Sequence, residues 1–208
     1  MIHNSMRTTQ AGFSLLEVLI TMAVLAVGLL GLAGLQGRGI NAETESFSRG
    51  QAMMLANELA DRMGANLAEL KTSTSASTGY NQQDGSSAKI IFGTSYANDC
   101  ITVGNNTSTL QAQCCATKTS MAARDLCEWD LALKGIAEST ASGGKMGGMS
   151  DARGCVFLAP NGEFEVDVVW KSRDIGVIGN GNTCGQAAIV SRRSGVSRTL
   201  RVAALGAP

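Results

Sequence analysis

The strongest hydrophobic pattern in this sequence is a long apolar run close to its beginning. No residue from Val18 to Gln36 is charged, and Thr21 is the one polar side chain before Gln36. As a helix, the segment from Phe13 to Leu35 would extend about 34 Å, which matches the hydrocarbon thickness of a bilayer. The pattern therefore predicts a helix that spans a membrane.

Helical periodicity continues beyond this run, into residues 41–70. Seven apolar residues there recur at helical spacing: Phe47, Met54, Leu55, Leu59, Met63, Leu67 and Leu70. This spacing predicts that the second half of the same helix is amphipathic. Glycines lie between the two halves, at positions 28, 31, 34, 37 and 39. Each glycine costs a helix about 1 kcal/mol relative to alanine, so the helix is expected to bend or melt there.

The second half of the chain predicts short elements separated by glycine-rich and serine-rich loops. We expect a weak β segment at 89–96 and a helix from Met121 to Glu138 that is capped by Ser120. We also expect a hairpin of strands 154–159 and 163–171 around the turn Pro160-Asn161-Gly162. A last strand is expected at 197–205. In the second hairpin strand Phe164, Val166, Val168 and Trp170 alternate with Glu163, Glu165 and Asp167, which predicts one buried and one solvent-facing side. The predicted fold is α+β, with a long N-terminal helix packed on a small antiparallel sheet.

The junction before the apolar run carries candidate chemistry. Gly12 is followed directly by Phe13, and Glu17 places a carboxylate just inside the apolar helix. Ionised carboxylates in lipid cost a few kcal/mol unless they find a partner, so Glu17 calls for a function. The alternative for Glu17 is an acid that only complements the helix dipole.

The segment from Ala11 to Glu17, with the apolar run behind it, resembles the class III signal of type IV prepilins. The resemblance implies that residues 1–12 are a leader removed by a prepilin peptidase, which cuts after Gly12 and methylates Phe13. It also implies that Glu17 docks the subunit by pairing with the N-terminal amine of an adjacent subunit. The expected organisation is a cleaved leader at 1–12, a transmembrane or filament-core half-helix at 13–40, and a periplasmic head at 41–208.

Composition restricts the chemistry of the mature chain. The 17 basic and 17 acidic residues balance, and loss of the leader removes only Arg7, so no broad footprint for nucleic acid is expected. The single histidine, His3, lies in the leader, which excludes hydrolases that use a histidine base. No metal site and no cofactor are expected.

Six cysteines in an exported chain predict disulfides. Cys155 begins the hairpin and Cys184 follows a glycine-rich loop, so a bridge between them would tie the loop to the sheet. The other four, Cys100, Cys114, Cys115 and Cys127, allow three pairings, with the adjacent Cys114 and Cys115 expected to bond to different partners.

Further segments resemble the type IV pilus modification proteins, the PilV family of minor pilins. They are residues 28–36, Gln51-Ala52, Ala60 to Asn66, the Leu126, Trp129 and Leu133 helix, Arg153-Gly154-Cys155, Val168-Val169-Trp170, Cys184-Gly185 and Arg192-Arg193. Residues 12–70 match closely and residues 71–120 poorly. The resemblance implies a non-catalytic minor pilin in a tip complex that primes pilus assembly. Its implied partners are other minor pilins, the major pilin and a tip adhesin, and its implied location is the inner membrane, then the pilus. The Asp61-Arg62 pair is a candidate contact, against the alternative of a solvated helix face.

Three other functions remain as alternatives. A minor pseudopilin of a type II secretion system would share the leader motif. A DNA-binding tip subunit is suggested by Arg192, Arg193, Arg198 and Arg201, although alternation places Arg198 and Arg201 on opposite sides of a strand. An anchored enzyme would have to use the carboxylates Glu163, Glu165 and Asp167, which have the spacing of ordinary solvent-facing acids.

Overall fold

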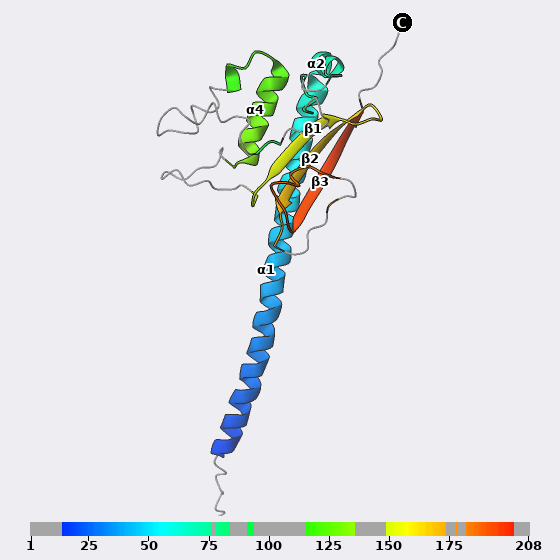
Figure 1. The fold of residues 1–208 in the computed structure, drawn as a ribbon. Coiled ribbons are helices and arrows are strands. Elements are labelled where there is room, and N and C mark those ends of the chain that lie inside the picture. Colours follow the sequence, from blue (N-terminus) through cyan, green and yellow to red (C-terminus); the bar gives the residue numbers. More distant parts are fainter. Residues whose placement is uncertain are drawn as a thin grey trace, which may run out of the picture. The chain divides into compact units, whose positions relative to one another are not determined.

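The computed structural model describes residues 14–75, 78–83, 91–93, 115–135, 149–173, 178 and 182–201. Its elements in chain order are α1 (Leu15–Ala65), α2 (Leu67–Thr72), α4 (Met121–Leu133), β1 (Arg153–Leu158), β2 (Glu163–Lys171) and β3 (Arg193–Arg201) (Figure 1). The chain divides into two compact units, Met1–Glu43 and Thr44–Pro208. The first contains the apolar part of α1, and the second contains the rest of α1 and every other element.

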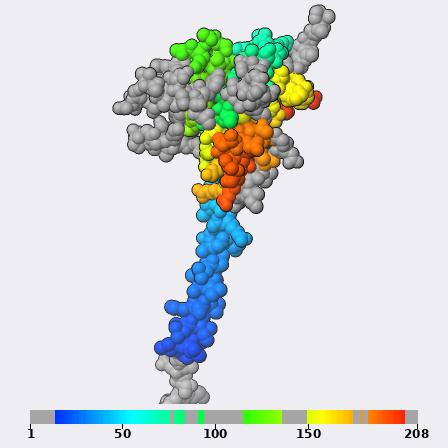
Figure 2. All heavy atoms as spheres, in the orientation of Figure 1, coloured from blue at the N-terminus to red at the C-terminus, as the bar shows by residue number. Residues whose placement is uncertain are grey.

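The apolar part of α1 is helical and uncovered. Among the described residues, α1 is the one helix long and apolar enough to cross a membrane, and its apolar window is 0% buried. Figure 2 draws this segment in blue. The helix runs without a break through the glycines at 28, 31, 34, 37 and 39, so it does not melt at these glycines. Nothing lies within 4 Å of a Cβ built on any of these five glycines.

The second half of α1 joins the core of the head through three alanines and two larger residues. Its buried positions are Ala52, Ala56, Leu59, Ala60 and Met63. The prediction from helical spacing was therefore only partly correct, because Phe47, Met54 and Leu67 are exposed.

The sheet is antiparallel, with the order β1-β2-β3, as Figure 1 shows. The predicted hairpin is confirmed: β1 and β2 pair from Arg153 opposite Val169 to Leu158 opposite Phe164. Gly162 has φ 79° in the turn, a left-handed conformation that suits glycine. The last strand begins at Arg193 and not at Ser197, and the predicted residues 202–205 lie outside the described part of the chain.

One face of β2 is buried as predicted, by Phe164, Val166, Val168 and Trp170, which join the main core. The other face is not solvated as predicted, because Asp167 is 0% exposed. A second cluster covers that face, formed by Cys155, Phe157, Val169, Cys184 and Ile189. Asp167 lies opposite Cys155 in the register and accepts a hydrogen bond from the Ser197 hydroxyl, Oγ to Oδ1 2.6 Å.

The helix α4 forms where its cap predicts. The Ser120 side chain accepts a hydrogen bond from the backbone N–H of Ala123, which satisfies an unpaired donor of the first turn. Trp129 packs against Phe92 with ring centroids 5.4 Å apart. The helix ends at Leu133, and the predicted extension to Glu138 lies outside the described residues. Of the predicted β segment at 89–96 only residues 91–93 are described, and Phe92 forms an isolated bridge with Gly154.

Two disulfides connect described residues. Cys155 bonds to Cys184, 29 residues further along the chain, and ties the loop before β3 to β1. Cys115 bonds to Cys127 within α4 and the turn before it. Closing loops of these sizes contributes about 2 to 4 kcal/mol each in the chain-entropy account. The other two cysteines, at 100 and 114, lie outside the described residues.

Candidate functional site

The candidate site lies at the N-terminal end of α1. Ser14 precedes the helix, and its carbonyl accepts the backbone N–H of Glu17 at 3.0 Å. Glu17 is therefore in the first turn, where a carboxylate complements the positive end of the helix. The predicted cleavage residues Gly12 and Phe13 lie outside the described part of the chain.

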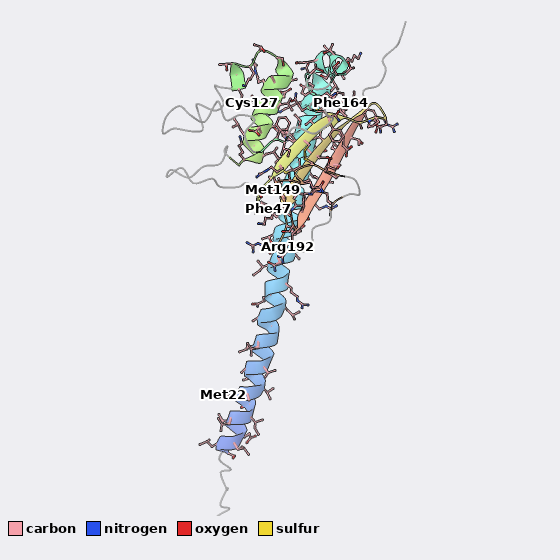
Figure 3. The ribbon with its side chains drawn as sticks, viewed as in Figure 1. Met22, Phe47, Cys127, Met149, Phe164 and Arg192 are labelled. Atoms are coloured by element: carbon pink, nitrogen blue, oxygen red, sulfur yellow. A yellow bond between two sulfur atoms is a disulfide. The ribbon has the colours of Figure 1, made fainter. Side chains whose placement is uncertain are left out.

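The surroundings of Glu17 are apolar. Leu15, Leu16, Val18, Leu19 and Ile20 are all exposed large hydrophobic residues in the same one and a half turns. A carboxylate among such side chains loses water in lipid at a cost of a few kcal/mol unless a partner compensates for it. In Figure 3 the side chains of this segment, with Met22 labelled, project outward from the helix. The site can therefore present one negative charge on an otherwise apolar helix.

Comparisons with known proteins bear on this end of the chain. Residues 7–33 match the protein family described as "Prokaryotic N-terminal methylation motif". No curated protein and no solved structure matches the chain. The methylation motif and the apolar helix support a type IV pilin-like or pseudopilin-type protein, anchored in a membrane before it assembles with other pilins.

The two residues of the predicted contact pair, Asp61 and Arg62, lie in different surroundings. Asp61 is exposed on α1. Arg62 donates to Glu58 at 2.7 Å and to Glu128 of α4, and lies 3.7 Å from Asp125. Burial lowers the pKa of Arg62, but its hydrogen bonds to Glu128 and Glu58 outweigh this effect and raise the pKa overall. Arg62 therefore joins α1 to α4 within the head, and Asp61 remains available.

A buried hydrogen-bond network continues from Arg62 to the end of α1. The Tyr80 hydroxyl donates to Asp125 at 2.5 Å, and the Asn66 side-chain amide donates to Tyr80 at 3.3 Å. Burial raises the pKa of Tyr80 well above its usual range, and the hydrogen bond to Asp125 adds to the rise. Sequence reasoning missed this network because Tyr80 and Asp125 are 45 residues apart, and no local pattern connects them. The i,i+4 spacing of Glu58 and Arg62 was the one signal available.

Glu69, in the first turn of α2, fixes the start of α4. Its carboxylate accepts hydrogen bonds from the backbone N–H of Ala122 and the side-chain amide of Asn66, both at 3.0 Å. Burial alone would raise the pKa of Glu69, but hydrogen bonds from Ser120, Ala122 and Asn66 lower it below its ordinary value of 4.5. The charged form is thus favoured in the folded chain.

Replacing Glu69 with glutamine is expected to make folding stability fall less steeply as the pH decreases. Folding lowers the pKa of Glu69, so the ionised carboxylate contributes fully to folding stability above about pH 4.5. This contribution is lost as the pH falls through the lower pKa of the folded chain. The test compares thermal unfolding midpoints of the detergent-solubilised chain between neutral and acidic pH, with Asp61→Asn, another carboxylate of the head, as the control. An unchanged acid slope for Glu69→Gln would contradict this role.

The arginines near β3 do not form one basic patch. Arg192 donates to the Arg173 carbonyl at 2.7 Å, and Arg193 donates to the carbonyls of Cys184 and Asn182 at 2.9 and 2.7 Å. Arg201 pairs with Glu163, and Arg198 lies opposite Val166 in the register. Arg198 and Arg201 are three positions apart along β3, so their side chains point to opposite faces of the sheet. Three of the four guanidinium groups are used within the chain, which weakens the DNA-binding alternative.

The carboxylates of β2 are likewise occupied within the sheet. Asp167 is buried against Ser197, and Glu163 pairs with Arg201. General acid–base chemistry requires a carboxylate that can reach a substrate proton. The described geometry of Glu163 and Asp167 gives no support to the anchored-enzyme alternative.

Proposed function

We propose that this chain is a non-catalytic minor pilin of the PilV type that helps to prime type IV pilus assembly. The observation that carries the proposal is the single carboxylate, Glu17, in the first turn of an uncovered apolar helix that matches a methylation motif. A signal peptide would need no such charge. A subunit that docks by its helix would benefit from one.

The proposed mechanism begins with cleavage after Gly12 by a prepilin peptidase. The cut creates a cationic amine at Phe13, which is then methylated, and leaves the apolar helix as the new N-terminus. Glu17 of this subunit pairs with the corresponding amine of an adjacent subunit. Attraction between the two charges is strong because neither is well solvated in the apolar surroundings. The pair also defines how far one helix is displaced along the next.

Each of the three predicted segments has its own proposed role. Residues 1–12 direct processing, residues 13–40 dock in the membrane or filament core, and residues 41–208 select partners. The partners are other minor pilins, the major pilin and a tip adhesin, so the final location is the pilus, at or near its tip. The two disulfides of the described head support a part that must stay folded outside the cell.

Deletion of the gene that encodes this chain tests the priming role. Priming predicts that sheared filaments fall to a few per cent of the wild-type amount, although this chain is a minor component of them, and that a plasmid copy restores them. A pseudopilin of a type II secretion system predicts the opposite pattern, with normal filaments and lost secretion. Normal filament yield in the deletion strain would overturn the priming role.

A further inference from the structure

Three exposed cations gather at one end of the sheet. Lys171 ends β2, Arg173 follows two positions later, and Arg192 directly precedes β3. The two strands are antiparallel, so the end of β2 meets the start of β3, with Lys171 opposite Arg193. The backbone N–H of Ser172 donates to the Arg192 carbonyl at 2.7 Å and holds the two segments together. We name Lys171, Arg173 and Arg192 the basic end of the head, where Figure 3 labels Arg192.

The described carboxylates at this end of the sheet have partners of their own. Asp151 pairs with Arg153 at 2.5 Å, and the Glu45 carboxylate accepts a hydrogen bond from the Ser172 hydroxyl at 2.7 Å. The Arg192 guanidinium donates to a neutral acceptor, the Arg173 carbonyl, which leaves its charge uncompensated. Basic side chains thus outnumber acidic ones among the described residues of this end, and its local charge is positive.

An apolar side chain lies beside these cations. Val190, two positions before Arg192, is 90% exposed, the highest value among the large hydrophobic residues of the described chain. Its neighbour Ile189 is buried in the second cluster, and the Ile189 N–H donates to the Gly185 carbonyl at 2.8 Å. The turn that carries Val190 is therefore anchored to the head. Cations alone suit any polyanion, whereas an exposed apolar side chain among them favours a membrane interface.

The basic end is also connected closely to the membrane-spanning run. The hydrogen bond from Ser172 joins it to α1 at Glu45, and Glu45 is nine positions after Gln36, where the uncharged run ends. Nine helical residues rise about 14 Å. The headgroup layer of a bilayer takes up roughly 5 to 7 Å of that length. The remainder is about one Debye length at physiological ionic strength, so charges at the membrane surface can act on the basic end.

We propose that the basic end binds the phosphate groups of anionic phospholipids while the chain is anchored in the membrane, with Val190 among the headgroups. Each basic residue close to an anionic membrane strengthens binding about fivefold, so three would strengthen it about a hundredfold. The contact requires the membrane anchor and no other subunit, so it goes beyond the proposed function. DNA is the other polyanion that three cations would suit, and Val190 and the short connection to the apolar run favour lipid.

Fluorescence quenching in vesicles tests this contact on the full-length chain. Acridonylalanine replaces the exposed Ser191, and the vesicles contain a lipid with a spin-labelled headgroup as the quencher. They consist of phosphatidylcholine alone or of a mixture with phosphatidylglycerol. Quenching at position 191 is expected to be at least about threefold greater in the mixture, and high salt should remove the difference. The same label at Asn161, exposed in the turn at the other end of β1 and β2, is the control and should not respond.

Substitutions assign the response to the basic end. Lys171→Gln with Arg173→Gln and Arg192→Gln is expected to remove the extra quenching. Arg173→Lys with Arg192→Lys should keep it, which separates the charge from the hydrogen bond between these two arginines. Val190→Ser should reduce it at least about twofold, because the apolar contact with the headgroup region is lost. The matched control removes three exposed cations elsewhere on the head and should keep the full response: Lys71→Gln, Arg198→Gln and Arg201→Gln.

Equal quenching at position 191 in the two kinds of vesicle would overturn the inference, and so would extra quenching that the triple glutamine variant retains. Retention of a DNA duplex by the full-length chain, lost in that variant and without any response to phosphatidylglycerol, would assign the cations to nucleic acid instead. No filament enters these measurements, so their failure leaves the proposed function standing. Normal filaments in the deletion strain would contradict the proposed function and leave the lipid contact standing.

Discussion

Replacing Glu17 with alanine is expected to lower the amount of this chain in sheared filaments at least about tenfold, with membrane insertion unchanged. Glu17 is the only charged side chain from Phe13 to Gln36, so its loss makes the helix more apolar and no less able to insert. Its proposed partner, the amine of the adjacent subunit, would be left as an unpaired charge in apolar surroundings. Such a charge costs a few kcal/mol, and each 1.4 kcal/mol corresponds to about a factor of ten in an equilibrium.

Two further variants separate charge from shape at this position. Glu17→Gln keeps the size of the side chain and removes the charge, so it should fail as alanine does. Glu17→Asp keeps the charge and should assemble better than either. The amounts in the membrane fraction and in sheared filaments are measured by immunoblot. Recovery of Glu17→Ala in filaments at the wild-type level would refute the docking role.

Replacing Gly154 with alanine is expected to destabilise the head by about 1 to 3 kcal/mol, the usual effect of overpacking a core. A Cβ at this position would lie 2.3 Å from Cη2 of Trp129 and 2.7 Å from Cδ1 of Leu133. Neither side chain can move freely, because Trp129 is 3% and Leu133 2% exposed, and the Trp129 indole N–H donates to the Leu55 carbonyl at 3.0 Å. Gly154 therefore sets the spacing between β1 and α4.

Gly64 provides a matched control for Gly154. It lies in α1, and nothing is within 4 Å of a Cβ built on it. Gly64→Ala should therefore stabilise the chain, by up to about 1 kcal/mol, through helix propensity alone. Chemical denaturation of the detergent-solubilised chain, followed by tryptophan fluorescence, measures both variants. Equal midpoints for Gly154→Ala and the wild type would show that the contact with Trp129 does not constrain the fold.

Local signals predicted the elements whose residues carry their own pattern. Ser120 caps α4 because its hydroxyl lies within reach of the Ala123 N–H, a relation contained in four residues. The Pro160-Asn161-Gly162 turn and the alternation in β2 likewise define a hairpin without reference to the rest of the chain. In contrast, Arg193, Ser194 and Gly195 have no hydrophobic alternation, and they become strand only by pairing with residues 169–171 of β2.

The incorrect predictions have a common physical cause. In each case, the surroundings of the residue are formed by a segment that is distant in the sequence. The core face of α1 was only partly identified because alanines give a weak hydrophobic signal, and three of its five buried residues are alanines. Asp167 was expected to be solvated, and the disulfide to Cys184 instead brings a cover over that face of β2. Arg62 was a candidate for a partner contact or for a solvated helix face, and Glu128 of α4 binds it within the head instead.

The most direct test of the central claim, that this chain is processed and assembled as a pilin, is the mass of its N-terminal peptide. The chain is isolated from the membranes of its own cells, digested and analysed by mass spectrometry. The account predicts a mature chain that begins at Phe13 and carries one additional methyl group on its amine. A chain that begins at Met1, or one cut behind the apolar helix, would contradict it.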